Sequence, residues 1–188
     1  MSTATAVLSV NEAEVVPVAK AIELWNLIPS ADRDKILERR RFEIVFADIV
    51  DMDILSKKAP AHWKVRPEDQ LPNVVSGKWE FDPQKIKLYL SAKQAPGKSI
   101  SGPDLCKELE GQLVFNDNLL DFFEENPKLI PKEYRGKWLI GWGRIYRDSR
   151  ESLFVRYLYV SGDGSCHSYY DYVASFFSSN CPAPVASK

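Results

Sequence analysis

The sequence lacks any hydrophobic run of the roughly 18 residues that a membrane-spanning helix requires. Its first residues, MSTATAVLSVNEAEVV, contain no cationic stretch and only a short apolar one, unlike a secretory signal peptide. The 25 Lys and Arg residues nearly balance the 26 Asp and Glu residues, which excludes a global electrostatic attraction to nucleic acid or to an anionic membrane. We therefore expect a cytoplasmic protein with no membrane partner.

Cysteine and histidine are also scarce. The three cysteines, Cys106, Cys166 and Cys181, are an odd number at wide spacing, which favours reduced thiols over a disulfide framework, although a Cys166–Cys181 bridge stays open. The two histidines, His62 and His167, lie far apart, and there is no CxxC or HxxxH pair. We expect no metal site and no cofactor.

The composition is that of an ordinary globular protein, with 188 residues of which 45% are hydrophobic and 12% aromatic. This length fits one domain with an added helical segment. Residues 1–10 are predicted to be a flexible tail, and residues 11–58 a helical segment. Apolar residues at helical spacing from Val15 to Trp25 predict a first helix, and Ser30 as an N-cap predicts a second from about residue 31.

Residues 42–50 support two interpretations. Phe42, Ile44 and Phe46 alternate like a strand, whereas Phe42, Val45 and Ile49 fit one face of a helix. We favour a helix through about residue 57 and leave the strand open. Residues 59–77 contain three prolines and scattered charge, which predicts an irregular connector between the helical segment and the rest.

Residues 78–177 predict an α+β domain. Alternating residues from Ile86 to Leu90 indicate a strand with one buried face. Ser101 and Gly111 bracket a short helix over about 102–110, and Asn116 is predicted to cap another that ends before Pro127. The aromatic-rich remainder, interrupted by two turn segments, predicts a three-stranded antiparallel meander. Residues 178–188 carry two prolines and are predicted to be a flexible tail that adds little to the core.

The segments LYLS, LIPKEY, IYRDS and VRYLY carry a resemblance that covers about residues 78–165. In these four segments the sequence resembles a family of uncharacterised bacterial proteins. Tyr134 stands where that family's pattern leads us to expect a tryptophan, a difference that concerns packing more than chemistry. The family has no assigned activity, so the resemblance implies no catalytic or binding residue.

Neither the sequence motifs nor their spacing predict a catalytic residue. Cys166 and His167 are adjacent, but neighbours in a strand point to opposite faces and cannot form a nucleophile and base pair. The acidic residues of helix 117–125 are explained more simply by a solvated face than by a metal cage. Gly141 and Gly143 do not precede a helix as a phosphate-binding loop requires, and they indicate a bulge or a close packing contact instead.

The strongest local signal lies in the predicted meander, where five basic and two acidic side chains between Lys137 and Val160 are interleaved with aromatics. A sheet of this kind can contact a protein or stack unpaired bases. The alternative is that the aromatics fill a half-buried sheet and the arginines pair with helix 117–125. The candidate binding residues are Trp142, Arg144, Tyr146, Arg156, Tyr157 and Tyr159.

Three functional hypotheses remain from the sequence. The first is a non-enzymatic protein-binding module that uses the aromatic and arginine surface, with an unknown protein as its partner. The second is an RNA or single-stranded DNA binder that uses the same surface. The third is an enzyme whose site the sequence does not show. The fold class is predicted to be α+β, with N-terminal helices followed by short helices packed on an antiparallel meander.

Overall fold

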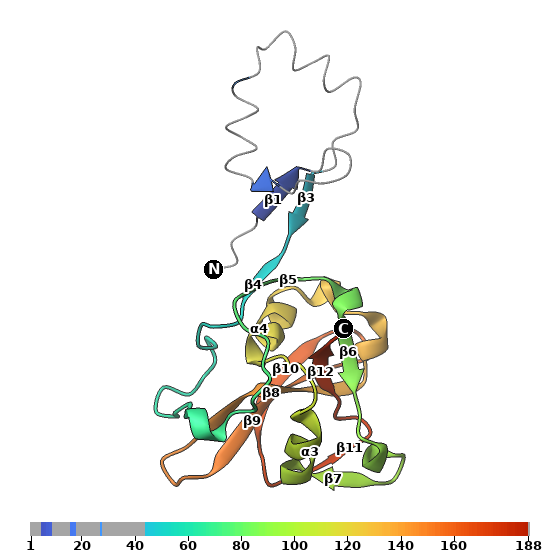
Figure 1. Cartoon of the computed structure of the whole chain (residues 1–188). Helices are drawn as coiled ribbons and strands as arrows, with labels where there is room; N and C mark the ends of the chain where they lie inside the picture. Colours follow the sequence, from blue (N-terminus) through green and yellow to red (C-terminus); the bar gives the residue numbers. More distant parts are fainter. Residues whose placement is uncertain (1–4, 9–15, 18–26, 28–43, 188) are drawn as a thin grey trace. The chain divides into compact units, whose positions relative to one another are not determined.

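The computed structural model describes residues 5–8, 16–17, 27 and 44–187, and the chain divides into two compact units, Met1–Ile49 and Val50–Lys188 (Figure 1). In the first unit, the described strands form one antiparallel sheet in the order β2-β1-β3. These strands are β1 (Thr5–Leu8), β2 (Val16–Pro17) and β3 (Ile44–Ala47).

The helix favoured over residues 42–57 is corrected by the structure from Ile44 onward. Residues 44–47 form β3, residues 49–51 form β4 (Ile49–Asp51), and the residues from 52 to 58 are not helical. Branched and aromatic side chains in this stretch suit extended backbone, and pairing with β1 and with β5 (Lys78–Glu80) supplies the hydrogen bonds that a helix would otherwise make. The helices predicted within residues 11–43 lie outside the described residues, except at Val16–Pro17, which is extended, and at Leu27, which is helical.

The second unit is organised around the predicted meander, which is confirmed. Its strands are β8 (Lys137–Arg147), β9 (Leu153–Val160) and β10 (Cys166–Tyr172), and they lie in the order β10-β9-β8 with antiparallel pairing throughout (Figure 1). The turn after β9 closes with Gly164 at a φ of 91°, a conformation that glycine adopts without a Cβ penalty. The α+β class is therefore correct for this unit.

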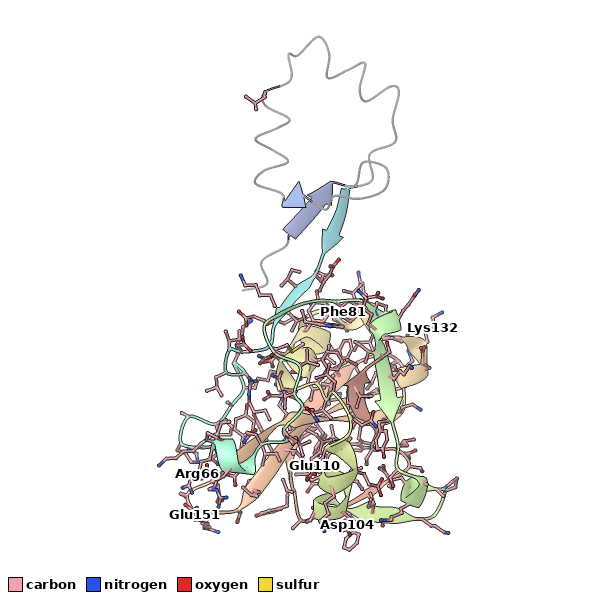
Figure 2. All side chains as sticks on the ribbon, viewed as in Figure 1. Arg66, Phe81, Asp104, Glu110, Lys132 and Glu151 are labelled. Atoms are coloured by element: carbon pink, nitrogen blue, oxygen red, sulfur yellow. The ribbon has the colours of Figure 1, made fainter. Side chains whose placement is uncertain are left out.

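Two α-helices occur among the described residues of this unit, and both begin where the sequence predicts. The Ser101 hydroxyl accepts from the Asp104 amide at the start of α3 (Gly102–Leu109), where Figure 2 labels Asp104. The Asn116 side chain accepts from the Asn118 amide at the start of α4 (Asp117–Glu125). Short 3₁₀ turns lie at Pro67–Asp69, Pro83–Lys85, Ala92–Gln94, Pro127–Leu129 and Lys132–Tyr134.

Three smaller sheets close the unit. β4 pairs with β5, β6 (Ile86–Tyr89) with β12 (Ala183–Ala186), and β7 (Ser99–Ser101) with β11 (Phe176–Ser178). The tail predicted over 178–188 is corrected here, because Ala183 and Val185 belong to the buried core. Proline has no backbone N–H to donate, but Pro182 and Pro184 use only their carbonyl groups here. The Pro182 carbonyl accepts from the Ile140 amide, and the Pro184 carbonyl accepts from the Phe115 amide.

The stretch 59–77 is irregular, as predicted, but it lies inside the second unit rather than between two parts. Leu71 and Val75 are buried in the core. The Gln70 side chain is bonded in both directions to the backbone of Ile145, at 2.9 and 2.8 Å. The boundary therefore falls at Val50, because contacts of this kind hold the proline-rich segment against β8.

Two apolar clusters lie on opposite sides of the meander. On the side that we call the α4 side, Leu139 and Leu158 pack with Phe123 of α4, and on the α3 side, Ile140 and Val155 pack with residues of α3. The two sides follow from the alternation of side chains along each strand. In the part of the chain that the structure describes, no helix is long and apolar enough to cross a membrane.

Candidate functional site

The six candidate binding residues do not share one exposed surface. Trp142, Tyr146 and Arg156 are completely buried, and Arg144 is 8% exposed. Only Tyr157 and Tyr159 are partly exposed. Four of the six residues therefore do not contribute to a joint exposed surface, and the alternative, in which the arginines pair with helix 117–125, is confirmed for Arg144 and Arg156.

A break in the register of β8 brings Gly141 and Gly143 against the start of α4. Pairing with β9 shifts between Ile140 and Ile145, while Trp142 packs in the apolar cluster on the α3 side, where its ring centroid lies 5.0 Å from that of Phe177. A Cβ at Gly141 would lie 3.1 Å from the Asp117 amide nitrogen, and a Cβ at Gly143 would lie 2.8 Å from that of Asn116. The two glycines thus mark both a bulge and a close packing contact, as predicted.

Arg144 forms a buried ion pair with the first residue of α4. Its Nη1 donates to Asp117 Oδ1 at 2.7 Å, and the hydroxyl of Tyr146 donates to Asp117 Oδ2 at 2.5 Å. Burial raises the pKa of Asp117 against the opposing effect of Arg144, and burial together with the Asp117 charge raises the pKa of Tyr146. Asp117 also lies at the positive end of the α4 dipole, which favours its carboxylate.

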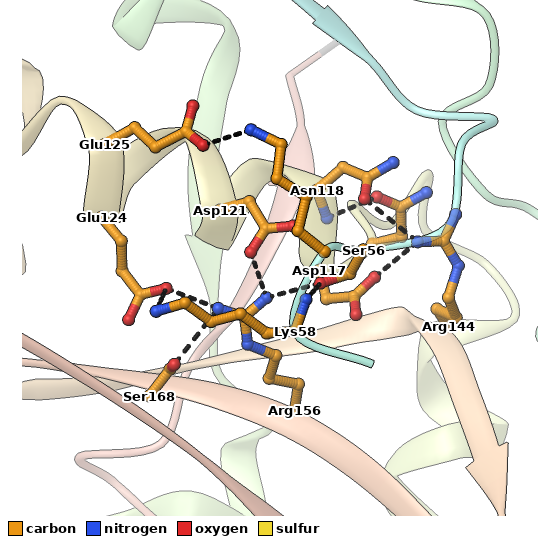
Figure 3. A network of polar contacts seen from close by, with 12 residues as sticks. Ser56, Lys58, Asp117, Asn118, Asp121, Glu124, Glu125, Arg144, Arg156 and Ser168 are labelled. Atoms are coloured by element: carbon orange, nitrogen blue, oxygen red, sulfur yellow. Dashed lines mark hydrogen bonds and ion pairs between the residues drawn. The ribbon is translucent and has the colours of Figure 1, made fainter. Parts of the chain in front are cut away.

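Arg156 is the centre of a second polar cluster, drawn in Figure 3. Its guanidinium donates to Asp121 and to Glu124 of α4, each at 2.5 Å, and also to the hydroxyls of Ser56 at 2.9 Å and Ser168 at 3.1 Å. Four of its five N–H donors are therefore used inside the protein. Burial alone would lower the pKa of Arg156, but the carboxylates of Asp121 and Glu124 outweigh burial and raise it.

These clusters fasten residues 51–58, which we call the strap, onto α4. Arg144 and Asn116 both donate to the Met52 carbonyl, at 3.0 and 2.7 Å, and Asn118 donates to the carbonyls of Asp51 and Ile54. At the far end of the strap, two lysines pair with the last turn of α4. These ion pairs are Lys57–Glu125 and Lys58–Glu124 (Figure 3). The polar residues of α4 therefore bind the protein's own chain.

The acidic residues of α4 are committed to these ion pairs, which accounts for them without a metal. Asp117, Asp121, Glu124 and Glu125 each have an Arg or Lys partner. Among residues 44–187 and the shorter described stretches, no group of three or more His, Cys, Asp or Glu side chains is arranged to hold a metal ion. The described residues therefore give no starting point for a metal centre.

The thiols of Cys106 and Cys166 lie in environments that disfavour thiolate formation. Burial raises the pKa of Cys106 to about 11 and also raises that of Cys166. Cys166 is paired with Val160 and His167 with Tyr159, so the two neighbours alternate across the strand. They do not form a nucleophile and base pair.

A different group of aromatics does share a partly exposed surface on the α3 side of the sheet. It consists of Trp138, Tyr157, Tyr159 and Tyr169, which we call the aromatic strip. The ring centroid of Trp138 lies 4.6 Å from that of Tyr159 and 5.1 Å from that of Tyr157. The ring centroids of Tyr157 and Tyr169 are 5.7 Å apart. Partial burial raises the pKa of Tyr157, as does the charge of Asp171. The rings form a continuous row across all three strands.

Sequence reasoning missed two members of this strip. Trp138 lies directly opposite Tyr159 on β9, and Tyr169 lies directly opposite Tyr157. The alternation of β8 and β9 was visible in the sequence, but joining the strands needs the pairing register. The turn at Gly162-Asp163-Gly164 fixes which residues of β9 and β10 lie opposite each other. From this turn alone, Tyr169 could have been placed beside Tyr157.

Comparisons with known proteins identify no relative of this chain. No protein-family model matches the chain, and no curated protein or solved structure is significantly similar to it. The resemblance to an uncharacterised bacterial family stays a prediction from the sequence.

Proposed function

We propose that the chain is a protein-binding module and that the aromatic strip is its contact surface. The proposal rests on one observation: four aromatic rings lie in contact with one another across three strands while remaining partly exposed. Tyr and Trp are the residue types that protein interfaces concentrate at their centres, because each buries a large apolar ring and keeps one polar atom for a hydrogen bond. Tyr169, at 55% exposed, offers the largest accessible ring of the strip.

The strip is held in place before any partner arrives. Trp138 and Tyr157 pack against the apolar cluster on the α3 side, and the remaining two rings pack on them. Side chains that are already ordered lose little conformational entropy on binding. A strip fixed in this way suits a specific contact better than a set of freely rotating side chains does.

The commitment of the arginines favours a protein partner over a nucleic acid. Arg144 and Arg156 are buried in ion pairs with α4, and Arg147 is paired with Asp69 and Glu151. Binding of single-stranded nucleic acid combines stacking with a basic groove that neutralises phosphates. The strip supplies the rings, but these three arginines are already neutralised inside the protein.

Two exposed tyrosines of the same strand provide a matched test. Tyr169 and Tyr172 are 55% and 53% exposed, but Tyr172 is paired with Phe154 and lies on the α4 side. The full chain should be immobilised and used to capture partners from a lysate of its host, with and without nuclease treatment. We expect Tyr169→Ala to reduce capture of the principal bound protein about tenfold, equivalent to about 1.4 kcal/mol. Tyr172→Ala should leave capture unchanged.

The two variants and the nuclease treatment give distinguishable results. Equal loss of capture in both variants would mean that the strip is not the contact surface. Capture that disappears after nuclease treatment, or that weakens steeply with salt, would replace the protein partner with a nucleic acid. Far-ultraviolet circular dichroism of each variant verifies that the sheet is intact.

A further inference from the structure

β10 forms one edge of the sheet β10-β9-β8. It is seven residues long, and its sequence, CHSYYDY, contains neither lysine nor proline. Natural proteins usually protect an edge strand with a lysine, a proline, a bulge or a covering loop, because its free backbone groups are a template for another strand. The pairing of β10 with β9 shows no shift in register, so there is no bulge either.

The phase of the hydrogen bonds shows which groups of β10 face outward. The Ser161 amide donates to the Ser165 carbonyl, and the Val173 amide donates to the Leu153 carbonyl. Because hydrogen-bonded pairs alternate along an antiparallel ladder, the odd-numbered residues of β10 face β9 and the even-numbered residues face away from it. The amides and carbonyls of Ser168 and Tyr170 therefore point outward at the centre of the edge.

We propose that β10 pairs antiparallel with β10 of a second copy of this chain, around a twofold axis at Tyr169. Tyr169 then lies opposite Tyr169 of the second copy, and Ser168 lies opposite Tyr170 of the second copy. The Ser168 and Tyr170 pairs exchange hydrogen bonds in both directions, on each side of the axis. The two three-stranded sheets become one continuous sheet of six strands.

Charge complementarity selects this register. Tyr169 is the middle residue of Cys166–Tyr172, and centring the axis there places His167 opposite Asp171 of the second copy, twice. The Tyr172 amide and carbonyl are already bonded within the chain, to Asp171 Oδ1 and to the Ser175 amide, so the new hydrogen bonds are those of Ser168 and Tyr170. An imidazole can donate a hydrogen bond to a carboxylate, and opposite pairs on one face of a sheet stabilise a register. Moving the axis by one residue, to Ser168, pairs His167 with Tyr169 and loses both contacts.

The register also joins the aromatic strips of the two copies. His167, Tyr169 and Asp171 lie on the α3 side of β10, the same side as the strip. With Tyr169 at the axis, the row of four rings in one copy continues directly into the row of the other. The self-association does not depend on the proposed function, since it uses the strand edge and leaves the outer faces of the rings accessible.

Disulfide trapping of the full chain tests the geometry. In a non-hydrogen-bonded antiparallel pair the Cα atoms lie about 4.5 Å apart, which suits a disulfide. Tyr169→Cys should therefore form a covalent dimer under mild oxidation, at least tenfold faster than the unmodified chain with its native cysteines. Phe176→Cys is the matched control, because Phe176 is even more exposed, at 71%, but lies on β11.

Sedimentation velocity of two charge variants provides an independent measurement. His167→Asp places like charges opposite each other and should raise the dimer dissociation constant at least tenfold, whereas His167→Lys should keep it within threefold of the original value or lower it. A monomeric chain at several hundred micromolar would overturn the proposal. Equal crosslinking of Tyr169→Cys and Phe176→Cys would overturn it too, as would a dimer that neither histidine variant changes.

Discussion

Arg156 and Tyr157 are neighbours in β9, yet they lie in opposite environments. Arg156 faces α4, is completely buried and has two carboxylates as partners, whereas Tyr157 faces the other side and belongs to a partly exposed row of rings. The difference arises from the two-residue period of the strand, which sends adjacent side chains to opposite sides of the sheet. Arginines of the sheet therefore form ion pairs with α4 on one side, while aromatic rings of the same strands form an accessible surface on the α3 side.

The largest expected effect on stability comes from removing the ion pairs between Arg156 and α4. Arg156→Met should lower the free energy of unfolding by about 3–5 kcal/mol, because the largely buried carboxylates of Asp121 and Glu124 lose their arginine partner and Glu124 keeps only the half-exposed Lys58. Urea denaturation measures the change. The combined variant Arg156→Met, Asp121→Leu and Glu124→Leu should recover most of the loss, since the one charge left without its partner, Lys58, is exposed to solvent. A loss below about 1 kcal/mol in the single variant would contradict the burial of this cluster.

A smaller effect is expected where β8 approaches α4. Gly143→Ala should cost about 1–3 kcal/mol, because the new Cβ would lie 2.8 Å from backbone atoms of Phe115 and Asn116. Gly162→Ala is the control: a Cβ there has open space, and its effect should stay within about 0.5 kcal/mol. Thermal unfolding followed by circular dichroism measures both. Similar values for the two variants would show that the close approach is not required.

The third prediction concerns an arginine on the α3 side. A hydrogen bond from Arg147 lowers the pKa of Asp69 in the folded chain. The Asp69 carboxylate therefore binds a proton more readily in the unfolded chain than in the folded chain. The stabilisation is therefore present above about pH 4 and is lost as the pH falls through the pKa of the folded state. Asp69→Asn should cost about 1 kcal/mol at pH 7, and the difference from the original chain should shrink towards zero at pH 3. Urea denaturation at pH 7, 5 and 3 tests the sign, and a difference that grows in acid would contradict it.

The smallest effect is expected on the aromatic strip itself. Tyr169→Ala should change the free energy of unfolding by less than about 0.5 kcal/mol, because more than half of the side chain is already exposed. Tyr172→Ala should cost more, about 0.5–1.5 kcal/mol, since Tyr172 packs on Phe154 with their ring centroids 4.3 Å apart. Urea denaturation of the two variants side by side gives the comparison. A larger loss at Tyr169 would mean that the strip serves the core.

Local signals in the sequence were enough to predict part of the second unit. Asn116 followed by apolar residues at helical spacing placed α4 correctly, and the turn residues after β8 and β9 placed the meander. Gly141 and Gly143 were correctly interpreted as a close contact, although the sequence did not indicate that α4 makes it. The helix cap and the turns depend on interactions between residues close together in the chain, whereas the glycine contact joins β8 to the start of α4.

The site was predicted less well because its contacts join distant segments. The exposure of Arg156 depends on Asp121 and Ser56, which lie 35 and 100 residues away in the sequence. Strand alternation alone could not distinguish an arginine in an ion pair from one in solvent. The strand Ile44–Ala47 was only the second of two interpretations for a related reason: its apolar residues fit both periods, and only pairing with Thr5–Leu8 decides between them.

The placement of β12 has a consequence for the order in which the protein folds during synthesis. The ribosome makes the chain from its N-terminus, so β8 and α4 emerge before residues 183–186 do. Until those residues emerge, the Ile140 and Phe115 amides lack the proline carbonyls that they bond to, and β6 lacks its neighbour. The core of the nascent second unit therefore stays incomplete on this side until residues 183–186 have been translated.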